Sequence, residues 1–343
     1  MSTPLARRAV LVATLFSVAG CGGAQMSSVS PAGPGTAAQS ESHRSGAQQI
    51  VPSTSFVHVG VPFAPRAPHS ASARVRPSFQ PAYSTKGVLL FEGDQSGQHV
   101  NIYRVKDLTS NPAPIATITD AAPCPYGMAR DSSGTLYLAN NCGASTITEY
   151  PKGQLTHTVE ITDGISNPLG VAIDKSDTLY VSNYPPAITE YAGGSTSPTT
   201  TITGGGLADP FGLALDKKGN LYVADFGASQ VFEIKAGTTT VTPLNLQDLE
   251  EPLGVAFDKK GNLWVTDGEG DKVNVYAPGS TTPSQTITAG YSFPYAISID
   301  KTVVVSNISP PVAVYAYMKN QYTSYATLTN GVTLPTGLLI TKL

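Results

Sequence analysis

Short runs in which apolar and polar residues alternate recur from residue 86 onward, with a glycine-containing turn between successive runs. In the clearest copy, residues 210–216 read Pro-Phe-Gly-Leu-Ala-Leu-Asp and residues 221–225 read Leu-Tyr-Val-Ala-Asp. A period of two, together with many β-branched and aromatic residues, predicts that both runs are β-strands. The turn between them, from Asp216 to Gly219, suits a hairpin loop whose glycine adopts the left-handed conformation.

This pair of runs belongs to a phrase close to Pro-x-Gly-apolar-small-apolar-Asp that occurs six times at a nearly constant interval. The steps between its prolines are 43, 42, 42, 42 and 41 residues. A repeat of about 40–45 residues with several short strands per copy is typical of a β-propeller, in which each repeat forms one four-stranded blade. The prolines are Pro125, Pro168, Pro210, Pro252, Pro294 and Pro335.

The two ends of the repeat array are incomplete in complementary ways. The first copy begins with its second strand at residues 88–91, and the last copy stops after its first strand, within residues 334–343. We therefore expect one blade to be shared by both ends of the chain, which removes the open sheet edge. Residues 86–343 are predicted to form an all-β, six-bladed propeller closed in this way. Third strands are expected at residues 101–103, 146–150, 188–191, 230–234, 272–276 and 312–315.

The segment before the repeats indicates export. Arg7 and Arg8 precede an apolar stretch at residues 9–20, which is too short to span a bilayer but suits a signal-peptide core. The stretch ends in Val-Ala-Gly-Cys at Cys21, which resembles the bacterial lipobox. That resemblance implies cleavage after residue 20 and lipid attachment to Cys21, whereas the alternative is an ordinary cleaved secretory signal.

Residues 21–85 have the composition of a disordered tether. They are rich in Ser, Ala, Gly and Pro and show no sustained periodicity. Such a composition buries too little apolar surface to offset the entropy of ordering the chain. We therefore expect a signal peptide at residues 1–20, a tether at residues 21–85 and the propeller at residues 86–343.

Charge argues against nucleic acid as a partner. Residues 86–343 contain 15 Lys and Arg against 23 Asp and Glu, a net charge of −8. A domain that neutralises phosphates needs a basic patch, and the sequence shows none.

The cysteines agree with export. Besides Cys21, only Cys124 and Cys142 occur, both in the second blade. Extending the hairpin register outward from Asp131 and Thr135 places Cys124 opposite Cys142, a separation that a disulfide can bridge. An oxidising compartment would form this bond. A reduced thiol pair that serves metal or redox chemistry is the alternative.

Polar residues end the second strand of every copy. They share one face of the disc with the starts of the first strands, so six side chains at one blade position can converge on a cation or a hydroxylated ligand. In the alternative interpretation they bond to local backbone amides and hold the next turn. The carboxylates Glu92, Asp225 and Asp267 are the members that would ligate a divalent cation. The ring is Glu92, Asn140, Asn183, Asp225, Asp267 and Asn307.

A second ring lies in the repeated phrase itself, at the residue after each proline. Its members are expected to crowd the mouth of the central channel. Tyr126, Phe211 and Tyr295 would stack there on a sugar or a planar ligand, or the ring would plug the channel as a small apolar core. The six residues are Tyr126, Leu169, Phe211, Leu253, Tyr295 and Thr336.

The copy at residues 209–225, Asp-Pro-Phe-Gly-Leu-Ala-Leu-Asp-Lys-Lys-Gly-Asn-Leu-Tyr-Val-Ala-Asp, resembles the NHL repeat, and all six copies over residues 86–343 fit that pattern. The resemblance implies a six-bladed propeller, and members of this class are platforms for protein or RNA, an amidating lyase and bacterial surface proteins. Propellers of the regucalcin and gluconolactonase family, which are distantly similar, hydrolyse lactones with a metal ligand in a Pro-Asp-Gly phrase. None of the six copies carries that acid.

Virginiamycin B lyase is another similar propeller and uses histidine-based, metal-assisted chemistry. In this chain the repeats contain only His99 and His157, neither at an inner-strand position. No Gly-x-Ser-x-Gly elbow, phosphate-binding loop or His/Cys metal spacing occurs, so no catalytic residue is assigned.

These observations favour a lipid-anchored propeller in the cell envelope, at the outer membrane or periplasmic face, that binds a protein, peptide or glycan as a monomer. No cofactor is assigned. The alternative is a metal-assisted lactonase or lyase of the gluconolactonase-like class, with Glu92, Asp225 and Asp267 as ligands of a divalent cation.

Overall fold

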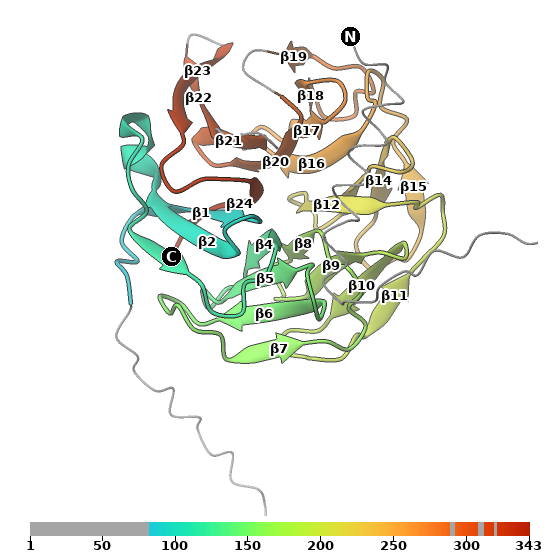
Figure 1. The fold of residues 1–343 in the computed structure, drawn as a ribbon. Helices are drawn as coiled ribbons and strands as arrows, with labels where there is room; N and C mark the ends of the chain where they lie inside the picture. The colour runs from blue at the N-terminus through green and yellow to red at the C-terminus, as the bar shows by residue number, and fades with distance from the viewer. Residues whose placement is uncertain (1–81, 289–291, 308–311, 319–320) are drawn as a thin grey trace, which may run out of the picture. The chain divides into compact units, whose positions relative to one another are not determined.

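The computed structural model describes residues 82–343, apart from residues 289–291, 308–311 and 319–320. Within these residues the strands form six four-stranded antiparallel sheets, arranged around a common centre like the blades of a propeller (Figure 1). The all-β propeller predicted from the repeat is therefore confirmed. The predicted signal peptide, the Cys21 lipidation site and nearly all of the tether lie outside the described residues.

Five of the sheets are each built from four consecutive strands, with the first strand at the centre. The second sheet contains β4 (Pro125–Arg130), β5 (Leu136–Asn140), β6 (Thr146–Tyr150) and β7 (Val159–Ile161). The third contains β8 (Val171–Ile173), β9 (Leu179–Asn183), β10 (Ala187–Tyr191) and β11 (Thr200–Ile202). The fourth contains β12 (Pro210–Leu215), β13 (Leu221–Asp225), β14 (Gln230–Ile234) and β15 (Val241–Pro243). The fifth contains β16 (Pro252–Phe257), β17 (Leu263–Asp267), β18 (Lys272–Tyr276) and β19 (Gln285–Ile287), and the sixth contains β20 (Pro294–Ile299), β21 (Thr302–Asn307), β22 (Val312–Met318) and β23 (Gln321–Leu328).

The first sheet combines both ends of the described chain, as the incomplete copies predicted. Its order is β24 (Pro335–Lys342), β1 (Val88–Asp94), β2 (His99–Arg104) and β3 (Ala116–Ile118). β24 pairs antiparallel with β1 from Val88 opposite Lys342 to Asp94 opposite Pro335. A 3-10 helix, η1 (Val105–Ser110), follows β2. Backbone pairing between β24 and β1, with one register shift between Gly93 and Asp94, thus holds the two ends of the described chain together.

The hairpins between first and second strands adopt the predicted turn. Gly134, Gly219 and Gly261 have φ angles of 94°, 87° and 88°, in the left-handed region that favours glycine. In the fourth sheet, Asp216 Oδ1 accepts hydrogen bonds from the backbone N–H groups of Lys218 and Asn220, at 2.7 and 2.9 Å. The recurring aspartate therefore stabilises its own turn. We call the side of the disc that carries these turns the hairpin face.

The glycine of the repeated phrase allows neighbouring sheets to approach closely. A Cβ atom on Gly254 would lie 2.7 Å from the carbonyl oxygen of Tyr295 in the next sheet. Gly170, Gly212 and Gly337 meet the next sheet's backbone in the same way. Real Cβ atoms do not approach an oxygen this closely, so any larger residue would push two first strands apart. Only the sixth sheet has alanine here, at Ala296.

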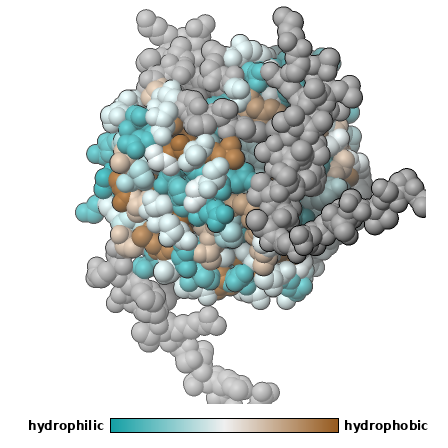
Figure 2. Space-filling model, viewed as in Figure 1, coloured by the Kyte–Doolittle hydropathy of each residue, from teal (hydrophilic) through white to brown (hydrophobic). Residues whose placement is uncertain are grey.

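The core lies between adjacent sheets, where apolar side chains of the second and third strands interdigitate. Trp264 is fully buried between the fifth and sixth sheets among Val273, Ile297 and Val305. On the face seen in Figure 2, hydrophilic and intermediate residues predominate, and hydrophobic ones lie in small separate groups. The described chain begins at the hairpin face, where the Ala82 amide donates to the Gly153 carbonyl at 2.6 Å.

Candidate functional site

The polar residues that end the second strands hold the loops that lead into the first strands. Asp225 is fully buried, and its two carboxylate oxygens accept hydrogen bonds from the backbone N–H groups of Ala208, Asp209 and Ala228 at 2.8–2.9 Å. Asp267 accepts in the same way from Glu250 at 3.0 Å. These carboxylates already have partners, as the loop-holding interpretation predicted.

The asparagines of the ring hold the same kind of loop or a neighbouring strand. Asn183 Oδ1 accepts from the Ser166 amide at 2.9 Å, and Asn307 Oδ1 accepts from the Ser292 amide at 3.4 Å. Asn140 instead donates through Nδ2 to the Thr148 hydroxyl at 3.0 Å. The ring side chains therefore turn toward their own sheets, and no group of three His, Cys, Asp or Glu residues able to hold a metal occurs among the described residues.

The structure corrects the predicted ring in the first sheet. Asp94, and not Glu92, lies opposite the proline of the phrase, as Asp225 lies opposite Pro210 in the fourth sheet. Asp94 also accepts hydrogen bonds from loop amides, including that of Leu334. Because the first copy lacks a first strand of its own, aligning the end of its apolar run placed the ring two residues too early.

Glu92 instead occupies a position that is apolar in the other sheets, equivalent to Val223 in β13. Its side chain is fully buried, Oε2 accepts from Asn101 Nδ2 at 3.0 Å, and Oε1 has no hydrogen-bond partner among the described residues. Burial raises the pKa of this carboxyl to about 8, the Asn101 hydrogen bond lowers it, and the Asp94 charge adds to the increase. Glu92 is thus a buried acid in the sheet that closes the ring.

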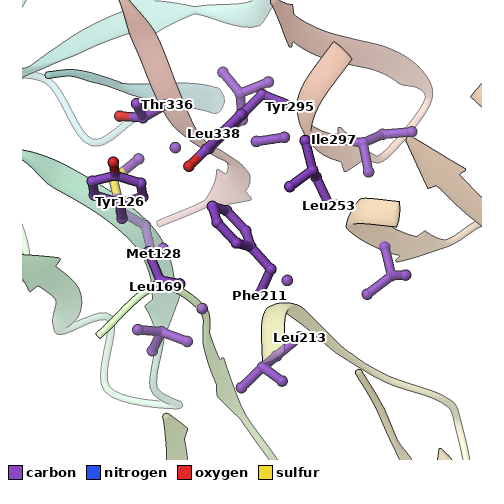
Figure 3. Close-up of a pocket in the computed structure, with 18 residues that line it drawn as sticks. Tyr126, Met128, Leu169, Phe211, Leu213, Leu253, Tyr295, Ile297, Thr336 and Leu338 are labelled. Atoms are coloured by element: carbon purple, nitrogen blue, oxygen red, sulfur yellow. The ribbon is translucent and has the colours of Figure 1, made fainter. Parts of the chain in front are cut away.

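The second predicted ring does line the central channel. Its six members, with the residues two positions further along each first strand, surround a cavity of about 80 Å3 (Figure 3). Phe211 and Tyr295 are in edge contact with ring centroids 4.9 Å apart, and Tyr126 lies 6.1–6.2 Å from both. All three are at least nine-tenths buried, so they close much of the channel with an aromatic cluster.

One polar atom in this cluster lacks a partner. The Tyr295 hydroxyl is buried and has no hydrogen-bond partner of ordinary geometry among the described residues, although the Tyr126 hydroxyl is close enough for the two groups to shift each other's pKa. In Figure 3 it points toward the channel centre. Burial above all, and then the neighbouring Tyr126 and Asp209, raise the pKa of Tyr295 well above 10.

Asp209 is a candidate that the sequence analysis missed. It immediately precedes Pro210, at the rim of the channel, and its carboxylate is half-buried without a hydrogen-bond partner among the described residues. Burial, followed by the charge of Asp225, raises its pKa to about 6. The available signal was the position before each proline, where only Asp209 and Glu251 are acidic.

A larger hollow, also missed, lies on the hairpin face between the fourth and fifth sheets. This inter-sheet groove has a volume of about 520 Å3 and is lined by Leu244, Leu246 and the edge-packed pair Tyr222 and Phe257, whose ring centroids are 4.8 Å apart. Charged residues, among them Lys218, border it. Such a groove arises only when two repeats pack together, so no single repeat reveals it.

Hydrogen bonds fix the walls of the groove. Lys217 Nζ on one hairpin donates to the Lys259 carbonyl on the next at 2.5 Å. The Gln247 amide donates to the Thr281 carbonyl at 2.8 Å on the outer side. The groove is therefore preformed, with a volume in the range of ordinary ligand sites.

The predicted disulfide is confirmed: Cys124 and Cys142 are bonded, with Cα atoms 5.4 Å apart. They are not directly opposed, because a β-bulge between Pro125 and Met128 shifts the register by one residue. Of the two histidines in the repeats, His157 Nδ1 lies 2.7 Å from Asp120 Oδ2, and His99 lies beside Asn101 in β2. Neither lines the channel cavity.

Comparison with known proteins supports the fold class. The sequence matches no protein-family model and no curated protein. The structure is similar to a chain of the nidogen/laminin complex, with a TM-score of 0.64 and 18% identity over 75% of this chain and 99% of that one. A protein of unknown function from Bacteroides caccae gives a TM-score of 0.58 at 13% identity, covering 75% of this chain and all of the other. Virginiamycin B lyase from Staphylococcus aureus, in a catalytically inactive form with quinupristin, gives 0.53 at 12% identity, covering 68% and 78%.

These similarities define a β-propeller and extend no further, because proteins this distant in sequence share a fold without sharing an activity. No helix among the described residues is long and apolar enough to cross a membrane.

Proposed function

We propose that this protein is a binding module of the cell envelope that holds a peptide segment of a partner protein in the inter-sheet groove. The observation that carries the proposal is the groove itself, a preformed hollow of about 520 Å3 with apolar walls and charged borders. The channel cavity, by comparison, has a volume of only about 80 Å3. A rigid groove binds without paying much ordering entropy, which favours a recognition role.

The lining of the groove favours a peptide over a glycan. Leu244 and Leu246 present aliphatic surface, and the Tyr222 hydroxyl is already engaged by Glu233 Oε1 at 3.0 Å. Sugars need hydroxyl partners at many points, whereas apolar peptide side chains fill aliphatic and aromatic surfaces. On either side of such a side chain, Lys218 on the border of the groove would pair with an acidic peptide residue, and Glu233 within the groove would pair with a basic one.

Two features support the envelope location. The Cys124–Cys142 disulfide suits an oxidising compartment. The sequence before residue 82 resembles a lipoprotein signal and tether. We also propose that the repeat is of the NHL type, on the basis of its Pro-x-Gly phrase and its spacing of about 42 residues.

A metal-assisted lactonase or lyase is less well supported. It would need Glu92, Asp225 and Asp267 to share one cation, yet no group of three such side chains able to hold a metal occurs among the described residues. Each of the two aspartates is bonded to backbone amides of its own loop.

The proposal is tested by selecting random peptides on the purified protein and measuring their affinities by calorimetry. We expect the selected peptides to carry apolar side chains and to lose at least tenfold in affinity with Leu244→Lys, which places a charge in the groove. Thr242→Lys is the matched control, because Thr242 is exposed on the same segment and does not line the groove. Thr242→Lys should leave the affinity unchanged.

Two results would contradict the proposal. Equal binding of the selected peptides to the wild type and to Leu244→Lys would place them elsewhere on the molecule. Glycan-array ligands whose binding is abolished by Leu244→Lys would instead assign the groove to sugars.

A further inference from the structure

The rim of the central channel, on the face opposite the hairpins, combines an uncompensated acid with an aromatic cluster. Asp209 precedes Pro210, and Phe211 follows it into the channel. The Asp209 amide is fixed by Asp225 Oδ1 at 2.8 Å, and its carbonyl accepts from the Phe226 amide at 3.0 Å. Its backbone is therefore rigid, while its carboxylate makes no hydrogen bond with the described residues.

The Tyr295 hydroxyl is a second, independent sign of a missing partner. It is buried beside the Tyr126 hydroxyl, has no hydrogen-bond partner of ordinary geometry among the described residues and points into the channel. A buried hydroxyl of this kind destabilises the fold unless a hydrogen-bonding group occupies the space beside it. The adjoining cavity of about 80 Å3 has room for a small group or a few waters.

The surroundings favour a positive charge on that group. The buried Asp225 carboxylate lies next to Asp209 and adds a second negative charge on this face. Lys272, which ends on this face of the fifth sheet, is already paired with Asp248 Oδ1 at 2.6 Å. A half-buried carboxylate among like charges gains more from a cation than an exposed one does, and the electron-rich face of an aromatic ring attracts cations as well.

We infer that the channel rim binds a primary ammonium group, such as a lysine side chain or a peptide amino terminus. Asp209 supplies the counter-charge, the Tyr295 hydroxyl accepts a hydrogen bond from the ammonium group, and the Phe211 ring packs against its methylene groups. An ammonium group fits this combination better than a metal ion, because a single carboxylate and an aromatic surface do not supply the several oxygen ligands that hard cations need.

The site lies on the opposite face from the inter-sheet groove and does not depend on it. The test uses n-butylammonium as the probe and n-butanol as its uncharged counterpart, with binding followed by ligand-detected NMR and calorimetry. We expect saturable, weak binding of n-butylammonium and none of n-butanol. Asp209→Asn should weaken the binding at least tenfold, and Tyr295→Phe should weaken it severalfold.

Asp163→Asn is the matched control, since Asp163 is an exposed acid on the same face whose side chain is remote from the channel lining. It should leave the affinity unchanged. Thermal melts check that each variant is folded. If Asp209→Asn does not fold, Tyr295→Phe provides the decisive comparison. The inference would be overturned if the binding of n-butylammonium did not saturate or if n-butanol bound equally well. It would also be overturned if neither Asp209→Asn nor Tyr295→Phe changed the affinity for n-butylammonium.

Discussion

The Tyr103 hydroxyl donates a hydrogen bond to the carbonyl oxygen of Asn330 at 2.8 Å, and this bond joins residues 227 positions apart in the sequence. The same contact occurs within other sheets, where a third-strand tyrosine reaches the loop that enters its own first strand. Tyr191 bonds the Asp163 carbonyl and Tyr276 bonds the Gln247 carbonyl, both at 2.7 Å. In the first sheet alone, a contact that is local elsewhere ties the two ends of the propeller together.

Tyr103→Phe should therefore loosen the closure of the ring. Removing the hydroxyl leaves the Asn330 carbonyl unpaired, and we expect a loss of about 1 kcal/mol in the free energy of unfolding. Tyr191→Phe, the matched control, should cost a similar amount. Only Tyr103→Phe should speed hydrogen exchange in β24 and β1, and equal exchange there in both variants would contradict the closure role.

A second prediction concerns the glycine of the repeated phrase. In Gly212→Ala, the new methyl group would collide with the Leu253 carbonyl of the fifth sheet. We expect a loss of about 1–3 kcal/mol, as for other overpacked interiors, measured by chemical denaturation. Ala296→Gly is the comparison, because a methyl group is already accommodated there, and it should cost only about 0.5–1 kcal/mol through backbone entropy. A neutral Gly212→Ala would show that the first strands are free to separate.

The ring residues provide a third prediction. Asp225→Ala removes the acceptor of three backbone amides, so we expect a loss on the order of 3 kcal/mol in the free energy of unfolding. Asp225→Asn should lose less, because Asn183 performs the same role in the third sheet with an amide oxygen. The melting temperature of the wild type should not change with EDTA. If EDTA lowered the melting temperature of the wild type but not that of Asp225→Ala, the ring would instead be a metal site.

The period of about 42 residues was sufficient to predict the sheets, their hairpins and the sharing of one sheet by both chain ends, because each repeat carries its own strand and turn signals. Details that depend on the register of strand pairing were harder to predict from the sequence. A β-bulge shifted the pairing around Cys124 by one residue. Because the first copy is incomplete, the alignment assigned Glu92 to the ring position that Asp94 occupies. The inter-sheet groove and the Asp209 rim arise from contacts between repeats, which periodicity alone does not encode.

The disulfide leads to a fourth prediction. Cys124 and Cys142 close a loop with a sequence separation of 18, for which the chain-entropy model gives roughly 3 kcal/mol. The double variant Cys124→Ser with Cys142→Ser should lose about that much, and reductant should lower the melting temperature of the wild type but not of the variant. A wild type indifferent to reductant under denaturing conditions, with both thiols free to alkylate, would contradict the bond.

The buried Glu92 should make stability depend on pH. Its pKa in the folded state is raised to about 8 from an ordinary value of 4.5, so the folded protein holds a proton that the unfolded chain releases. The stability that depends on protonated Glu92 is therefore fully present below about pH 4.5 and is lost as the pH rises through about 8, at up to about 1.4 kcal/mol per pH unit.

Glu92→Gln isolates this effect from other groups that titrate in the same range, such as Glu149, whose pKa burial raises to about 7. Glutamine keeps an oxygen for Asn101 Nδ2 but never ionises. The difference in the free energy of unfolding between Glu92→Gln and wild type should therefore grow in favour of the variant from pH 5 to pH 9. Glu160→Gln, at an exposed strand position, should show no such trend. A difference independent of pH would mean that Glu92 is ionised throughout and is balanced by a cation beside Oε1, the oxygen without a partner among the described residues.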